Sequence, residues 1–294
     1  MKNIVCFGEV LWDLLPSGKT AGGAPMNVAY HLNNFGYHTQ MISCIGADDL
    51  GAELLEFLQK KQLDTQLIQH TSDFPTGTVK VSLDDKGHAS YEIVQPVAWD
   101  FITLQENALK AVQQSDAFIF GSLALRETNT RNTLFELLEK ATLKVLDVNL
   151  RPPHYSKALF ESLFPKVNIV KMNDEELELI GEWMTNGESL EEKAQQLCQL
   201  YNWDTLIITQ GGDGAFVIHD GIIFKESGTK IKVKDTIGSG DSFLAAFLSK
   251  KLEGAPPPTC LRLACATGAY VATQQGGTPE FTEEESEAFL VSNS

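Results

Sequence analysis

Near the end of the chain, the segment Asp235-Thr236-Ile237-Gly238-Ser239-Gly240-Asp241 places glycines and a carboxylate directly before an apolar stretch. Phe243 and Phe247 begin an apolar repeat with helical spacing, which predicts a helix that starts at the glycines. A helix start leaves backbone N–H groups unpaired and carries a partial positive charge, so it suits a phosphate group. A carboxylate at that place would repel phosphate unless it removes a proton from an attacking hydroxyl, which makes Asp241 a candidate general base. An ordinary glycine turn with a helix cap is the alternative.

A second glycine segment, Gly22-Gly23-Ala24-Pro25-Met26-Asn27, precedes another predicted helix. Its glycines let the backbone approach a ligand closely, and Asn27 offers both a donor and an acceptor. Asp13 lies upstream in an extended stretch, where its carboxylate could accept hydrogen bonds from two adjacent hydroxyls, as a sugar presents. A simple turn and cap would explain each of these features equally well.

Two more polar segments follow predicted strands. Thr209-Gln210-Gly211-Gly212-Asp213-Gly214 lies at the carboxyl end of one, where open α/β sheets bind ligands, and could hold the phosphates or ribose of a nucleotide. A glycine hairpin between strands is the alternative. Asn173-Asp174-Glu175-Glu176 begins a helix, where acidic residues are common, yet Asn173 and Glu176 could also hold water on Mg²⁺.

The elements that would position these residues follow an alternating pattern of short apolar runs and helical repeats, which predicts βα units around a mainly parallel sheet. The predicted strands are Ile4–Phe7, Gln40–Ile45, Ala117–Phe120, Lys144–Val148, Ile169–Met172 and Leu206–Thr209. The predicted helices are Asn27–Phe35, Gly51–Lys61, Thr128–Lys140, Glu175–Ile180, Leu190–Tyr201, Ser242–Leu252, Leu261–Thr273 and Glu283–Val291.

Two regions depart from this alternation. Residues 76–83 and 88–94 alternate around Asp84-Asp85-Lys86-Gly87, which predicts a β-hairpin, and residues 9–16 are also extended. We expect them to form a small sheet that covers the mouth of the main domain.

Composition limits the partners and the compartment. The chain has 294 residues and a formal net charge of −16, so neither nucleic acid nor an anionic membrane is an expected partner. Five cysteines without a Cys-x-x-Cys pair indicate free thiols of a reducing compartment, and no apolar stretch approaches a membrane span. We therefore expect a cytoplasmic protein. Ser17-Gly18-Lys19-Thr20 is no P-loop, because Asp13 stands where that motif requires glycine.

Taken together, the motifs closely resemble those of the PfkB (ribokinase-like) family of carbohydrate kinases, and within it the fructokinases. The two glycine segments occur in the family's order, with Asn173-x-x-Glu176 and Thr209-x-Gly211-x-x-Gly214 between them. The resemblance spans the whole chain and implies one kinase domain, residues 1–294. Its fold would be a Rossmann-like three-layer α/β domain with a β-sheet lid formed by about residues 9–22 and 76–98.

The resemblance also implies a role for each candidate residue. Asp241 would be the catalytic base, and the backbone N–H groups of Gly238, Ser239 and Gly240 would form an anion hole. Sugar contacts would come from Asp13, Gly23 and Asn27, and the ATP site would be lined by Thr209, Gly211 and Gly214. Asn173 and Glu176 would order the Mg²⁺ shell through water. Asp235 and the carbonyl of Ile237 would bind a monovalent cation such as K⁺, together with carbonyls of residues 274–276.

The implied activity is ATP-dependent phosphorylation of the primary hydroxyl of a ketohexose, with D-fructose as the expected substrate. Fructokinase-like features are the Ala24-Pro25 pair, Ala98-Trp99-Asp100 and Asp147-x-Asn149-x-Arg151. The last also occurs in 2-keto-3-deoxygluconate kinases, where arginine suits the sugar acid, so that activity is the alternative. A non-catalytic sugar- or nucleotide-binding protein is the hypothesis from another class. Many family members dimerise through the lid, so a homodimer is expected.

Overall fold

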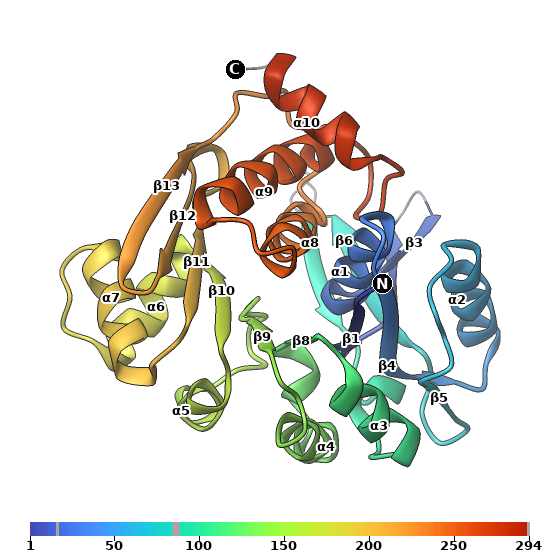
Figure 1. Cartoon of the computed structure of the whole chain (residues 1–294). Helices are drawn as coiled ribbons and strands as arrows, with labels where there is room; N and C mark the ends of the chain where they lie inside the picture. Colours follow the sequence, from blue (N-terminus) through green and yellow to red (C-terminus); the bar gives the residue numbers. More distant parts are fainter. Residues whose placement is uncertain (16–17, 84–88, 293–294) are drawn as a thin grey trace.

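The computed structural model describes residues 1–15, 18–83 and 89–292, and in them a nine-stranded sheet lies between two layers of helices (Figure 1). The strand order is β13-β12-β11-β10-β9-β8-β1-β4-β5. Neighbouring strands from β10 to β5 are parallel, as is β10 with β11, whereas β12 and β13 are antiparallel additions. The strands are β1 Asn3–Phe7, β4 His38–Gly46, β5 Ile68–Thr71, β8 Ala117–Gly121, β9 Lys144–Asp147, β10 Ile169–Asn173, β11 Thr205–Thr209, β12 Gly214–His219 and β13 Ile222–Ser227.

The central strands are apolar on both faces because helices cover both. In β1, Ile4 and Cys6 belong to one hydrophobic core, whereas Val5 and Phe7 belong to the other, and all four are fully buried. Alternate side chains of a strand point to opposite faces, so each strand contributes to both cores. A continuous apolar run is the pattern expected of a parallel sheet enclosed in this way.

Helices of the two layers come from different parts of the chain. One face is covered by α1 Ala24–Asn34, α2 Asp49–Lys60, α8 Ser239–Leu252 and α9 Pro257–Ala272, with α10 Glu283–Ser292 packed on α9. The other is covered by α3 Glu106–Gln114, α4 Thr128–Leu138, α5 Lys157–Leu163, α6 Asp174–Met184 and α7 Leu190–Tyr201. Figure 1 shows the sheet between these two groups.

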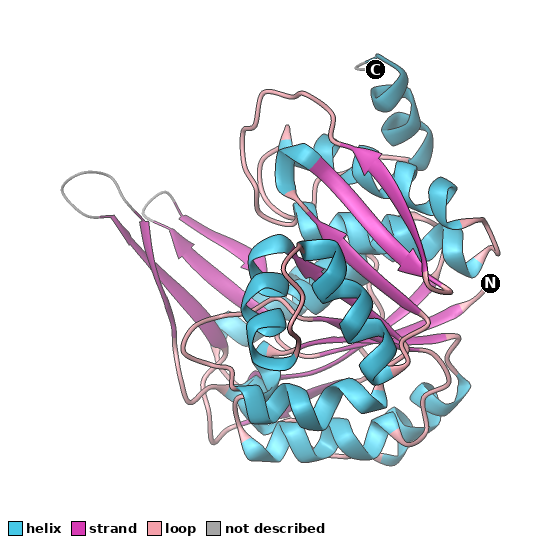
Figure 2. Cartoon of the chain, turned by 90° about the vertical axis from the view of Figure 1, so that its left-hand side faces the viewer, coloured by secondary structure: helices cyan, strands magenta, loops and turns pink. Residues whose placement is uncertain are grey.

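A smaller sheet extends from one side of the main domain (Figure 2). Its strand order is β3-β2-β6-β7, with β2 Leu11–Leu15, β3 Gly18–Gly22, β6 Gly77–Leu83 and β7 Ala89–Ile93. Both segments predicted to form the lid therefore contribute strands to one sheet, and the predicted hairpin is confirmed by the β6–β7 pairing. The turn predicted at 84–87 lies outside the described residues, as do Pro16 and Ser17.

The α/β fold with its mainly parallel sheet is confirmed, and each predicted strand and helix is present with ends shifted by a few residues. The sequence analysis did not predict α3, α5, β5, β12 or β13 as elements. Helix α3 buries only Ala108 and Val112, so its apolar repeat is sparse, and α5 has only seven residues. Strand β13 is an edge strand with a largely exposed pattern, which weakens any apolar signal.

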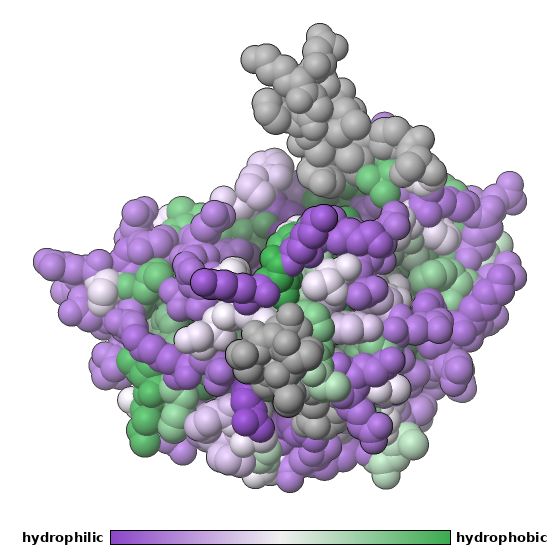
Figure 3. Space-filling model, turned by 90° about the horizontal axis from the view of Figure 1, so that it is seen from above, coloured by the Kyte–Doolittle hydropathy of each residue, from purple (hydrophilic) through white to green (hydrophobic). Residues whose placement is uncertain are grey.

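The surface of the molecule is mostly polar in one view. Seen from above, the molecule presents mostly hydrophilic side chains, with apolar ones in small separate groups (Figure 3). None of the helices in the described ranges is long and apolar enough to cross a bilayer. All five cysteines are free thiols, as predicted.

Candidate active site

Two of the predicted site residues, Asn173 and Thr209, lie next to each other at the carboxyl edge of the large sheet. In the β-sheet register, Asp147 at the end of β9 is paired with Lys171 of β10, and Asn173 at the end of β10 is paired with Thr209 at the end of β11. Parallel strands end at the same edge, so segments far apart in sequence lie side by side there. This is the edge at which open α/β sheets bind their ligands.

The glycine segment before α8 forms the helix start that the sequence predicted. Gly238 is the N-cap residue, and its φ of 77° lies in the left-handed region that favours glycine. A Cβ at Gly238 would lie 2.5 Å from Cα of Gly277, so a side chain is also excluded by packing. A Cβ on Gly240 would lie 3.0 Å from Nζ of Lys171, which places an ammonium group beside the predicted anion hole. The N–H of Ser239 makes a long hydrogen bond of 3.3 Å to the carbonyl of Thr236.

The carboxylate of Asp241 is buried at this helix start, with the side chain of Asn27 beside it. Nδ2 of Asn27 donates a 2.8 Å hydrogen bond to Oδ2 of Asp241, although the two residues are 214 positions apart. Burial, and then the nearby Asp147 carboxylate, raise the pKa of Asp241 to about 6, while Lys171 and Asn27 act to lower it. Asp241 thus titrates nearer to neutral pH than an exposed aspartate, which is the property expected of a general base.

Lys171 and Asp147 form a buried ion pair next to the anion hole. Nζ of Lys171 lies 3.0 Å from both carboxylate oxygens of Asp147, and the two side chains are 8% and 4% exposed. Burial acts to lower the pKa of Lys171, but Asp147, Glu176 and Asp241 together raise it above its ordinary value. Lys171 therefore stays charged at the place where phosphate oxygens would lie, because three carboxylates surround it.

The proposed sugar side of the site contains two carboxylates and an arginine. Burial raises the pKa of Asp13, in β2, to about 6 and that of Glu9 to about 7, and the positive charge of Arg151 opposes both shifts. Oε1 of Glu9 accepts a 3.3 Å hydrogen bond from the N–H of Ala24, whereas its buried Oε2 accepts none from the residues that the structure describes. Gly23 is fixed by packing, since a Cβ there would lie 2.3 Å from the carbonyl oxygen of Glu9.

The loop predicted to bind a monovalent cation is held together by Asp235. Its Oδ1 accepts a 3.0 Å hydrogen bond from the N–H of Ile237, and its Oδ2 accepts another of 3.0 Å from the N–H of Gly276. The two predicted segments, 235–237 and 274–276, are therefore in contact. Whether a cation binds between them stays a prediction.

Asn173 and Glu176 form a reciprocal capping box at the start of α6. Oδ1 of Asn173 accepts from the N–H of Glu176, and Oε2 of Glu176 accepts from the N–H of Asn173. Oε1 of Glu176 accepts from the N–H of Leu150, so each carboxylate oxygen already has one backbone donor. Burial raises the pKa of Glu176, and Lys171 opposes that shift. Within the described ranges no group of three or more His, Cys, Asp or Glu could hold a metal ion. That Asn173 and Glu176 order the water shell of Mg²⁺ stays a prediction.

The glycines after β11 differ in what they do. Gly214 begins β12, and a Cβ there would lie 2.1 Å from the carbonyl oxygen of Glu226, so packing of the antiparallel strands requires it. Gly211 has a φ of 54°, and Gly212 follows it. A Cβ added to either glycine would have no other atom within 4 Å. The hairpin alternative therefore explains Gly214, whereas Gly211 and Gly212 leave open space beside Thr209 where a nucleotide could approach.

Sequence reasoning did not place Lys171 or Glu9 in the site, although both were visible as charged residues in or next to buried strands. A lysine in the middle of the apolar run Ile169–Met172 was the available signal, because a fully buried lysine needs a carboxylate partner. The partner, Asp147, is 24 residues away, so only strand pairing reveals it.

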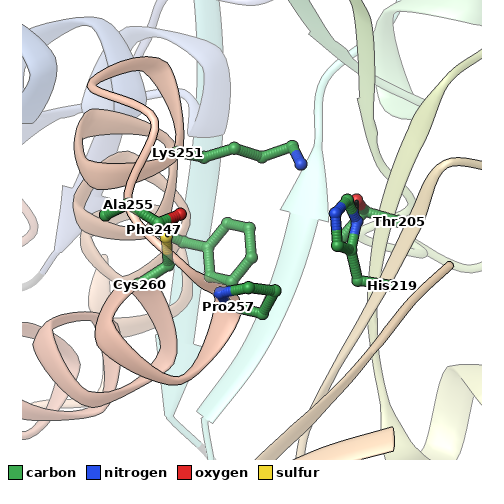
Figure 4. Close-up of a pocket in the computed structure, with 7 residues that line it drawn as sticks. All are labelled: Thr205, His219, Phe247, Lys251, Ala255, Pro257 and Cys260. Carbon is green, nitrogen blue, oxygen red and sulfur yellow. Dashed lines mark hydrogen bonds between the residues drawn. The ribbon is translucent and has the colours of Figure 1, made fainter. Parts of the chain in front are cut away.

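A small pocket elsewhere is not part of this site (Figure 4). It lies between α8, the start of α9 and strands β11 and β12, and is lined by Thr205, His219, Phe247 and Lys251, among others. Its volume of about 20 Å³ holds a single water molecule and no sugar.

Comparison with known proteins identifies the family of this chain. The model of the "pfkB family carbohydrate kinase" matches residues 1–284. The chain belongs to the PfkB family of carbohydrate kinases. It is 28% identical to "Probable fructokinase-3" of Arabidopsis thaliana over 98% of this chain and 91% of that protein. It is 27% identical to the "2-dehydro-3-deoxygalactonokinase" of Haloferax volcanii over 98% and 96% of the two chains.

Solved structures of this family show the same fold. The fructokinase from Vibrio cholerae O395, in its fructose, ADP and calcium ion bound form, is 25% identical with a TM-score of 0.85, covering 99% of both chains. A double mutant of that enzyme, in a fructose, ADP and potassium ion bound form, is 24% identical with a TM-score of 0.85, covering 99% of this chain and 98% of its own. The expected family and the expected ribokinase-like fold are therefore confirmed.

Proposed function

We propose that this PfkB kinase transfers the γ-phosphoryl group of ATP to the primary hydroxyl of a ketohexose, with D-fructose as the substrate. One observation carries the proposal. The buried Asp241 carboxylate, held by Asn27, lies at a glycine helix start beside the Lys171 ammonium group. A base that accepts a hydroxyl proton and a positive site for phosphate are thus side by side. The fructokinases among the relatives support the choice of sugar.

In the proposed reaction, Asp241 removes the proton of the substrate hydroxyl while that oxygen bonds to the γ-phosphorus and ADP leaves. The backbone N–H groups of Gly238, Ser239 and Gly240, with Lys171, stabilise the charge on the transferred group. Phosphoryl transfer needs mainly this positioning and charge stabilisation. For Ser239 to contribute, its long bond to Thr236 has to be exchanged for one to phosphate.

Ions and the lid complete the proposed site. Mg²⁺ neutralises phosphate charge when bound, and Asn173 and Glu176 would hold its water shell, because their own oxygens also serve the helix cap. Asp235 and the carbonyl of Ile237 would bind K⁺, because the Asp235 carboxylate joins the two segments that would surround the ion. Thr209, Gly211 and Gly214 would line the ATP site. The sheet of β2, β3, β6 and β7, which lies within the expected lid segments 9–22 and 76–98, would act as the lid that excludes water.

A second candidate is phosphorylation of a 2-keto-3-deoxy sugar acid such as 2-keto-3-deoxygluconate. The positive charge of Arg151 acts to lower the pKa values of both Asp13 and Asp241, so it is felt on the sugar side of the site. There it would attract the carboxylate of a sugar acid. The relative from Haloferax volcanii acts on an acid of this type, by its name. In the fructose proposal, Arg151 instead balances the charges of Glu9, Asp13 and Asp241.

The test is an ADP-release assay with fructose, tagatose, ribose, glucose and 2-keto-3-deoxygluconate, followed by NMR of the product to locate the phosphate. We expect fructose to give the highest kcat/KM. A tenfold preference needs about 1.4 kcal/mol of differential transition-state binding, which one hydroxyl contact supplies. A higher kcat/KM for 2-keto-3-deoxygluconate would favour the second candidate. ADP release that no sugar stimulates would favour a non-catalytic binding protein.

We also propose a cytoplasmic location, which its five free thiols support, and a homodimer formed through the lid. Sedimentation of the purified protein tests the dimer.

A further inference from the structure

A pocket of about 250 Å³ lies outside the proposed kinase site and is rich in basic and hydrogen-bonding side chains. It lies where the residues after β7, the residues before and within α4, and the loop after β9 come together. Its polar lining consists of Gln95, Arg126, Arg131, His154, Tyr155 and Ser156. Neither Asp13 nor Asp241 lines it. The volume is that of a small metabolite, below the range of drug-sized ligands.

Arg126 is held rigidly at this pocket. Its Nε and Nη2 donate to the two carboxylate oxygens of Asp100 at 2.6 and 2.8 Å, and Nη2 also donates to the carbonyl of Val94 at 2.7 Å. The guanidinium carbon lies 4.0 Å from the centre of the Trp99 ring. The side chain is only 3% exposed, yet Nη1 donates to none of the residues that the structure describes. A buried nitrogen with two unused N–H groups requires an acceptor that the chain does not supply.

Arg131 and His154 add to the positive character of the pocket. Asp100 already balances the charge of Arg126. Arg131 donates to the neutral hydroxyl of Thr128 and forms no ion pair with a carboxylate of the residues that the structure describes, so its charge is not balanced there. Burial, and then the charge of Arg126, lower the pKa of His154. The Asp100 carboxylate, which is paired with Arg126, acts to raise that pKa. An anion is the ligand that such a pocket attracts.

The loop after β9 separates this pocket from the kinase site. The charge of Arg151 acts to lower the pKa values of Asp13 and Asp241. Three residues later, the pKa of His154 is lowered by the charge of Arg126 and raised by that of Asp100. The two ends of this short loop therefore serve two different sites.

We propose that this pocket binds a phosphate-class dianion, either free or carried on a small metabolite, between Arg126 and Arg131. Arginine is suited to this role because its planar N–H groups match the oxygens of a phosphate group. Nη1 of Arg126 has almost no accessible surface, so the lining has to shift for an anion oxygen to accept from it. The site goes beyond the proposed kinase reaction and does not depend on it.

The experiment is calorimetric titration of the full chain, with a non-hydrolysable ATP analogue present to occupy the nucleotide site. Inorganic phosphate is the first ligand and glucose 6-phosphate is the second, which distinguishes a free anion from an esterified one. We expect at least one of them to bind with one-to-one stoichiometry. Arg131→Gln should weaken that binding by about 10-fold or more, since it removes a charge-assisted hydrogen bond.

Arg262→Gln is the matched control, because Arg262 is an exposed arginine of α9 that does not line the pocket. The Arg262→Gln variant should bind the phosphate ligand with the same affinity as the wild type. His154→Gln is a second pocket variant and should also weaken binding, which keeps the test decisive if Arg131→Gln unfolds. Absence of binding by both ligands would overturn the proposal. So would wild-type affinity in either pocket variant that melts normally.

Discussion

Replacing Asp241 by asparagine should abolish most of the activity and at the same time stabilise the protein. The substitution keeps the size and polarity of the side chain, and an asparagine oxygen can still accept the hydrogen bond from Asn27. It removes the group that accepts the substrate proton. General-base catalysis contributes typically about 10²- to 10⁴-fold, so kcat should fall by at least about 10² while ATP affinity is retained.

The stability gain follows from the pKa of the carboxylate. Burial raises the pKa of Asp241 from 3.8 to about 6 in the folded protein. One pKa unit corresponds to about 1.4 kcal/mol, so ionising this group in the fold costs about 3 kcal/mol at neutral pH. The folded state binds more protons than the unfolded state between pH 3.8 and about 6, so the free energy of unfolding decreases as pH rises through that window. Above about pH 6, the free energy of unfolding is lowered by the full cost of keeping the Asp241 carboxylate ionised in the fold.

Asparagine does not ionise, so the variant should unfold at higher denaturant concentration than the wild type at pH 7 and at an equal one near pH 3.8. Urea unfolding at both pH values, with ADP release at pH 7, measures the two effects together. A matched control is Asp64→Asn, which removes a partly exposed carboxylate that accepts a hydrogen bond from Gln40 and is not one of the proposed site residues. That control should retain wild-type kcat.

The wild-type enzyme should also lose kcat in acid, at saturating sugar, as Asp241 takes up a proton. With a pKa of about 6, the ionised fraction decreases from about 0.9 at pH 7 to about 0.1 at pH 5. Near-wild-type turnover of Asp241→Asn with a normal melting profile would falsify the general-base role. A loss of stability at pH 7 would refute the argument from burial.

Three further predictions concern the residues around this base. Asp13→Ala should raise the KM for fructose by about 30-fold or more with ATP binding unchanged, because a carboxylate that accepts two hydroxyl hydrogen bonds contributes roughly 2 to 4 kcal/mol. An unaltered KM would show that Asp13 does not bind the sugar. Gly238→Ala should lower both kcat and melting temperature, since its Cβ would lie 2.5 Å from Gly277 at a φ of 77°; calorimetry and ADP release check it, and normal values would contradict the packing argument. Lys171→Met should destabilise the fold by about 3 to 5 kcal/mol, because Asp147 is left buried without its partner. Adding Asp147→Asn should restore the stability measured in urea but not the activity. Recovered activity in the double variant would exclude Lys171 from phosphate binding.

Local patterns in the sequence were sufficient for the kind of fold and for the main motifs. Strands such as Ile169–Asn173 are apolar because both sheet faces are buried, and that pattern is visible without coordinates. The glycines before Asp241 mark a helix start because the apolar repeat begins just after them. Helix α7 was predicted with the bounds Leu190–Tyr201 that the structure has, and in the structure Ser189 and Glu192 form a capping box at its start.

Other features needed the tertiary structure, because they depend on contacts between distant residues. The sequence shows Asp241 as a carboxylate, but its raised pKa depends on burial and on Asp147. The glycine at 238 could be read as a ligand-binding feature alone, yet contact with Gly277 also requires it. The pairing of Lys171 with Asp147 follows from strand register, which no local pattern records. Sequence therefore determined which residues could act, and packing across the sheet edge decided their charge, their neighbours and which of them also support the fold.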